Sequence, residues 1–200
     1  MEEKDFLLTL SDTKADITPY PALALKDSKF RDILVRQLLN NHAINVYHHS
    51  FLILHEAIKT EPSLFYCYWD GFSSLLKHGN SYHRNYGMAL IANLIAVDKD
   101  NRFELIMDDY FKQLEDEKIS TIKYCISNSL IIIKAKPVFG KTIISRIIHS
   151  LRFNDHSDRH QKFLVSVFLK LLASIDKDFQ EMAIVKEFIR DINIDKRFKH

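Results

Sequence analysis

The stretch from residue 80 to residue 137 constrains the fold most, because it contains three successive helical patterns of one design. Residues 118–137 are apolar on almost all sides, which predicts a helix that is packed by neighbours on both faces. An amphipathic outer helix joined by a short acidic turn to an apolar inner helix is a unit that can repeat along a chain. The outer helix is predicted from apolar residues at three-and-four spacing: Phe103, Ile106, Met107, Tyr110, Phe111 and Leu114.

The length and composition favour a single all-α domain. The 200 residues are 46% hydrophobic and include only four glycines and four prolines, and period-two alternation is absent. A chain of this length buries on the order of 70% of its unfolded surface, so it needs no disulfide or metal to fold. We therefore expect Cys67 and Cys125, which lie within apolar helical patterns, to be buried and reduced.

The hydropathy of the chain predicts a cytoplasmic protein without a membrane partner. The N-terminus is acidic where a secretory signal would be basic, and its apolar run is too short for such a signal. No later stretch supplies the roughly 18 apolar residues that a membrane-spanning helix requires.

Turn-forming and capping residues divide the chain into three parts. Residues 1–27 are predicted to form an N-terminal arm, in which Pro19 and Pro21 interrupt any helix and one short helix covers residues 6–10. Residues 28–192 form the helical body, and residues 193–200 a frayed tail. The predicted helices of the body cover residues 29–41, 45–59, 63–78, 80–98, 101–117, 118–137, 138–152, 159–174 and about 177–192.

The helical patterns recur with a period of about 38 residues. A polar or acidic turn precedes each inner helix, and a basic residue or histidine follows about one turn into it: His48, Arg84, Lys123 and Lys162. This arrangement resembles the HEAT repeat of armadillo-type proteins, although His48 and the Asn40-Asn41 turn depart from that motif. The resemblance implies a right-handed α-α superhelix of about four to five helix pairs, with the four residues along its concave side. These residues are our candidate binding residues; the alternative is a structural bond from each to the acidic turn of the adjacent repeat.

The charge is unevenly distributed along the chain. Residues 118–174 contain ten Lys or Arg and only two acidic residues, a balance of 10 − 2 = +8, whereas the whole chain carries +2. Such a segment attracts nucleic acid or an acidic protein. The alternative is that neighbouring repeats supply the opposite charge and that the basic residues solvate exposed faces.

The sequence contains no recognisable catalytic or metal-binding motif. His48 and His55 lie two helical turns, or about 10 Å, apart. His156 and His160 have the four-residue spacing of a chelating pair, but His156 lies in a predicted loop and no glutamate accompanies them as in a helical HExxH site. Glycosylases built from HEAT-like repeats use aromatic and acidic residues, which would correspond to Trp69-Asp70, but Trp69 lies on an apolar stripe and is predicted to be buried.

We therefore expect no cofactor, and a non-enzymatic scaffold that binds a protein or peptide on its concave face. The alternative function is nucleic-acid binding through residues 118–174, with a relation to the HEAT-like glycosylases. The sequence indicates neither an oligomeric state nor the identity of a partner.

Overall fold

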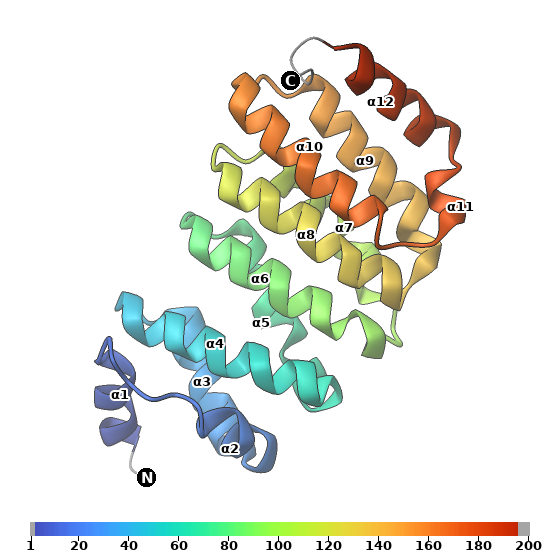
Figure 1. Ribbon diagram of the computed structural model, residues 1–200. Coiled ribbons are helices and arrows are strands. Elements are labelled where there is room, and N and C mark those ends of the chain that lie inside the picture. Colours follow the sequence, from blue (N-terminus) through green and yellow to red (C-terminus); the bar gives the residue numbers. More distant parts are fainter. Residues whose placement is uncertain (1–2, 196–200) are drawn as a thin grey trace.

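The computed structural model describes residues 3–195, and within that range the secondary structure is entirely helical (Figure 1). The all-α class predicted from the sequence is confirmed. The α-helices are α1 (Glu3–Ser11), α2 (Tyr20–Lys26), α3 (Ser28–Asn40), α4 (Ile44–Thr60), α5 (Trp69–Ser74), α6 (Ser81–Leu94), α7 (Arg102–Phe111), α8 (Ile119–Ala135), α9 (Gly140–Phe153), α10 (Asp158–Leu172), α11 (Lys177–Gln180) and α12 (Ala183–Ile194). Short 3₁₀ turns join them: η1 (Pro62–Tyr68), η2 (Leu75–Lys77), η3 (Ile95–Val97), η4 (Lys112–Glu115) and η5 (Pro137–Phe139).

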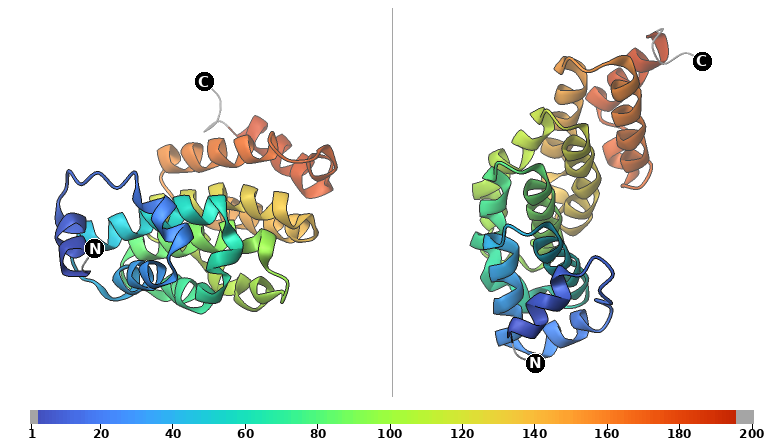
Figure 2. Two further views of the ribbon diagram at one scale, coloured as in Figure 1. Left: turned by 90° about the horizontal axis from the view of Figure 1, so that it is seen from below. Right: turned by 90° about the vertical axis from the view of Figure 1, so that its left-hand side faces the viewer.

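The helices alternate between two layers. Helices α4, α6, α8 and α10 lie side by side and run in the same direction, and we call them the first layer (Figure 1). Each packs on the helix or turn that precedes it, and the preceding elements α3, α5, α7 and α9 form the second layer. The molecule is therefore elongated, and helices α1 and α12 lie at opposite ends of the stack (Figure 2).

Most hydrogen bonds between consecutive parts of the stack fall in one range of sequence separation. Their partners are between 32 residues apart, as in Arg84 and Asp116, and 40 residues apart, as in Asn154 and Leu114. Other examples are the bonds His48–Tyr86, Gln113–Leu76, Lys136–Asp98, Arg146–Asp108 and Arg152–Asp191. The bond from the Tyr110 hydroxyl of α7 to the carbonyl oxygen of Met88 in α6 spans 22 residues and is an exception. These bonds connect each helix pair to the next one along the chain.

The N-terminal arm is folded onto the first helix pair. Phe6 and Leu10 of α1 are buried, and the Phe6 ring lies 4.7 Å from the ring of Phe30 in α3. The expectation that Pro19 and Pro21 exclude a helix is wrong, because α2 begins directly after Pro19. Proline is tolerated in a first helical turn, where its missing N–H has no intrahelical acceptor to lose.

Two predicted helices of the body are interrupted. The segment 63–78 consists of η1, α5 and η2 in succession, and the last predicted helix is split into α11 and α12 around Met182. The predicted tail begins too early, since residues 193 and 194 belong to α12, and residues 196–200 lie outside the described part of the chain.

The core lies between the layers. Trp69 is buried as predicted, with 1% of its surface exposed. Gly87 of α6 lies so close to the second layer that an added Cβ would be 2.9 Å from the Cβ of Leu75 and 3.0 Å from the carbonyl oxygen of Phe72. Cys125 is buried, but the prediction of a buried Cys67 is wrong, because its thiol lies on the exposed side of η1.

No helix within residues 3–195 combines the length and apolar character needed to cross a bilayer.

Candidate functional site

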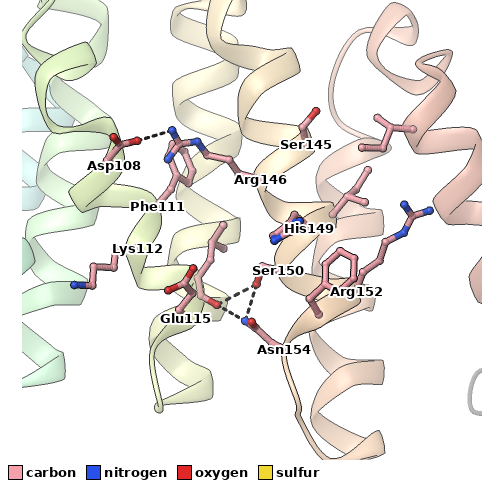
Figure 3. A pocket seen from close by; sticks show the side chains of 14 residues that line it. Asp108, Phe111, Lys112, Glu115, Ser145, Arg146, His149, Ser150, Arg152 and Asn154 are labelled. Carbon is pink, nitrogen blue, oxygen red and sulfur yellow. Dashed lines mark hydrogen bonds and ion pairs between the residues drawn. The ribbon is translucent and has the colours of Figure 1, made fainter.

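A groove of about 690 Å³ opens between the C-terminal end of α7 with η4, helix α9 and the start of α12 (Figure 3). Its floor is formed by the buried side chains of Phe111, Leu114 and Ile148. Ile184 of α12 lines one edge, and Phe153 of α9 projects with 71% of its surface exposed. A volume of this size is typical of sites that hold a small ligand or a few residues of a peptide.

Charged side chains surround the apolar floor. Arg146 of α9 donates a hydrogen bond of 2.5 Å to Asp108 of α7 across the groove, and its guanidinium lies 5.8 Å from the centre of the Phe111 ring (Figure 3). Arg152 forms ion pairs with Glu187 and Asp191 of α12. The carboxylates in these pairs are 90%, 52% and 46% exposed, so the arginines are held by partners that water also reaches.

One backbone oxygen fixes the two walls of the groove relative to each other. The carbonyl oxygen of Leu114 in η4 accepts hydrogen bonds from Ser150 Oγ at 3.0 Å and from Asn154 Nδ2 at 2.8 Å. Both donors belong to the C-terminal end of α9 and the residue that caps it. The groove is therefore held open by a bonded frame, and His149 faces it from the same helix (Figure 3).

Two of the four residues predicted to bind a partner are engaged within the protein. His48 Nδ1 lies 2.7 Å from the hydroxyl oxygen of Tyr86. Arg84 forms an ion pair with Asp116, which is the acidic turn residue before α8, and donates to the carbonyl oxygens of His78 and Gly79. Arg84 thus makes the bond to the adjacent turn that the structural alternative describes.

The other two predicted residues, Lys123 of α8 and Lys162 of α10, are exposed, and neither forms an ion pair with another described residue. All four predicted residues lie on first-layer helices. None of them lines the groove, whose walls come from α7, η4, α9 and α12.

Ion pairs with residues outside the segment neutralise part of the positive charge of residues 118–174. Lys136, Arg146 and Arg152 pair with acidic residues that lie before or after this segment in sequence. The remaining seven of the ten basic residues are exposed and form no ion pair within residues 3–195: Lys118, Lys123, Lys134, Lys141, Arg159, Lys162 and Lys170. Neighbouring helices therefore neutralise a minority of the segment.

The sequence reasoning missed the aromatic residues beside the free lysines. Tyr124 follows Lys123 on α8 and Phe163 follows Lys162 on α10, and their exposed fractions are 37% and 42%. The available signal was a five-residue repeat, KYCIS at 123–127 and KFLVS at 162–166. The groove was missed too, because its walls come from separate helices and no local pattern marks it.

The structure assembles no metal site among residues 3–195, and one of its two thiols is buried. No three His, Cys, Asp or Glu side chains in that range are placed to hold one ion. Burial raises the pKa of the Cys125 thiol far above its usual range, which keeps it protonated and unreactive. The comparisons add no identity: no family model, curated protein or solved structure matches this chain.

Proposed function

We propose that this protein is a non-enzymatic interaction module that binds a peptide segment of a partner protein in the groove between α7 and α9. The observation that carries the proposal is the combination of an apolar floor, an exposed Phe153 and partly exposed arginines in one solvent-open groove. Peptide sites of this kind use an apolar surface for affinity and a few charged groups for orientation.

We infer further that the module belongs to the HEAT-like class and forms a superhelix of four helix pairs, with α12 as an additional helix at the end. The range of 32 to 40 residues between hydrogen-bonded partners supports this reading, because a repeat protein contacts its sequence neighbours at one spacing. The concave side would then be formed by the first layer, and the groove lies on the other layer.

The two free thiols of the protein support a reducing, cytoplasmic location.

The groove fits a peptide with an apolar side chain next to a carboxylate. Phe153 and Ile184 offer apolar contact at the edge, where burial of an exposed ring stabilises a complex. Of the three basic side chains in the lining, Arg146 and Arg152 are paired with carboxylates, and Lys112 forms no ion pair with a described residue. Lys112 is therefore the cation that an incoming carboxylate would meet first. An incoming carboxylate would compete with the exposed partners of Arg146 and Arg152.

The test is selection of binders from a displayed library of random peptides, followed by measurement of their affinity in solution. We expect the selected peptides to share an apolar residue beside Asp or Glu. Phe153→Asp should weaken their binding at least tenfold, because it removes the ring and adds a like charge. Lys112→Glu should weaken the acidic peptides more than their amide analogues.

The matched control is Leu105→Asp, which changes a side chain of α7 that is 85% exposed and does not line the groove. This variant should bind the selected peptides like the parent protein. Selection of peptides that bind the parent and Phe153→Asp equally well would exclude the groove as their site. Circular dichroism of each variant verifies that the helical fold is retained.

A further inference from the structure

The free lysines of the first layer are concentrated on two neighbouring helices and alternate there with exposed aromatic or apolar residues. We call the surface formed by Lys123, Tyr124 and Lys134 of α8 and by Lys162, Phe163 and Lys170 of α10 the lysine–aromatic face. Its four lysines are exposed and have no acidic partner within the described chain. It lies on the opposite layer from the peptide groove and shares no residue with it.

The two helices present the same chemistry in the same places. The lysine, the aromatic residue and the serine of KYCIS each lie 39 positions before their counterparts in KFLVS. Helices α8 and α10, which carry these segments, pack side by side and run in the same direction (Figure 1). Because adjacent helices pack about 8–10 Å apart, the two rings and the two lysines form parallel rows across the helix axes. Lys134 and Lys170 extend the face towards the C-terminal ends of the helices.

The acidic residues around this face are few and lie at the starts of its two helices. Helices α6 and α8 contain no acidic residue, and α10 contains only Asp158, at its first position. The exposed acidic residues nearest in sequence lie at the starts of the two helices: Glu115 and Glu117 precede α8, and Asp155 and Asp158 lie just before and at the first position of α10. A negatively charged chain that approaches the first layer therefore meets no repulsive side chain on α6 or α8.

We propose that the lysine–aromatic face binds single-stranded nucleic acid, with the lysines on phosphates and Tyr124 and Phe163 stacked on bases. Several free cations over two helices suit a repeating polyanion, and exposed rings offer stacking surfaces to unpaired bases of any sequence. Bases inside a duplex are already stacked on each other, so the rings favour single strands. This activity is independent of the proposed peptide groove.

The experiment is fluorescence anisotropy of the full chain with a labelled single-stranded oligonucleotide and its duplex, across a salt series. We expect micromolar binding of the single strand, weaker binding of the duplex, and an affinity that falls steeply with salt. Lys123→Glu with Lys162→Glu should weaken binding at least tenfold and reduce the salt slope by about 0.7 for each lysine removed. Tyr124→Ala with Phe163→Ala should weaken binding about tenfold or more with the slope unchanged.

The matched control for charge is Lys14→Glu with Lys29→Glu, two exposed lysines that lie before and at the start of α3 and form no ion pair with a described residue. It changes the net charge equally and should retain most of the affinity. Leu105→Ala is the control for loss of an exposed apolar side chain. An equal loss in the control lysine pair, or no binding at low salt, would overturn the proposal.

Two further outcomes are decisive. Equal binding of polyglutamate, without a loss in Tyr124→Ala with Phe163→Ala, would assign the face to an acidic protein and reject nucleic acid. Phe153→Asp should leave oligonucleotide binding intact, so failure of the peptide groove and failure of this face give different results.

Discussion

Arg84 and Asp116 join α6 to the turn before α8 through two hydrogen bonds from one guanidinium, 2.8 Å from Nε and 2.5 Å from Nη2 to the same carboxylate oxygen. The pair is largely withdrawn from water, with side-chain exposures of 17% and 7%. Arg84 also satisfies two carbonyl oxygens that follow η2. One side chain therefore connects the turn before α6 to the corresponding turn before α8 in the next helix pair.

Arg84→Ala is expected to destabilise the fold by about 3 kcal/mol, because it leaves the Asp116 carboxylate enclosed without its cation. Urea denaturation measures the change. The comparison is Arg36→Ala, which removes an ion pair with Glu3 whose side chains are 52% and 42% exposed. That change should cost less than about 1 kcal/mol. Equal costs for the two variants would contradict a special role for Arg84.

Gly87→Ala is expected to cost about 1–3 kcal/mol, because the new methyl group would overlap Leu75 and the backbone at Phe72. Gly79→Ala is the control, since no atom lies within 4 Å of a Cβ built there. It should change the free energy of unfolding by less than about 0.5 kcal/mol. A neutral Gly87→Ala in chemical denaturation would show that α6 and η2 can move apart.

Acidification below about pH 6.5 is expected to lower the free energy of unfolding, because three histidines of helices α4 and α6 become protonated more readily in the unfolded chain. Burial lowers the pKa of His83, and the nearby His78 lowers it further; burial also lowers the pKa of His48 and of His55. Below pH 6.5 the unfolded chain therefore binds more protons than the folded one. The contribution of these histidines to the free energy of unfolding is fully present above the unfolded pKa of 6.5 and decreases as the pH falls towards their lowered folded pKa.

Urea midpoints measured between about pH 7.5 and pH 5 test this expectation. His83→Gln should reduce the slope of stability against pH in that window, because glutamine does not titrate. Leu105→Ala is the control, since Leu105 is exposed and carries no titratable group, so the slope should stay unchanged. A slope that is the same in the parent and in His83→Gln would assign the pH dependence to other groups.

The two thiols are expected to react at very different rates. Cys67 is exposed and should be labelled by a thiol reagent in the native protein, whereas Cys125 is buried and should react only after unfolding. Burial also raises the pKa of Cys125, which suppresses the reactive thiolate. Mass spectrometry of peptides after brief labelling gives the two rates, and Cys67→Ser should abolish native labelling.

The sequence was sufficient for the helical class and for most element boundaries, because those features have local causes. Pro62 and Pro137 mark the ends of α4 and α8, and the burial of Trp69 follows from its place on an apolar stripe. The error at Pro19 arose because proline can begin a helix as well as end one. The exposure of Cys67 depends on the 3₁₀ geometry of η1, which apolar periodicity does not indicate.

The candidate sites were only partly predictable. Lys123 and Lys162 were found from the period of the chain, and their aromatic neighbours could have been found from the same comparison. The groove depends on how the carbonyl of Leu114 meets Ser150 and Asn154, which are more than 30 residues away in sequence. Such meetings are set by tertiary packing and leave no mark in a short window.

The spacing of 32 to 40 residues between hydrogen-bonded partners limits how far the effect of a substitution travels. A change in α3 is felt directly by the next helix pair, and its influence on α9 must pass through two intervening helix pairs. Substitutions at the two ends of the described stack should therefore add in their free energies, and those in adjacent pairs should not. The peptide groove can thus be altered, lost or redesigned without consequence for the packing of the first helices.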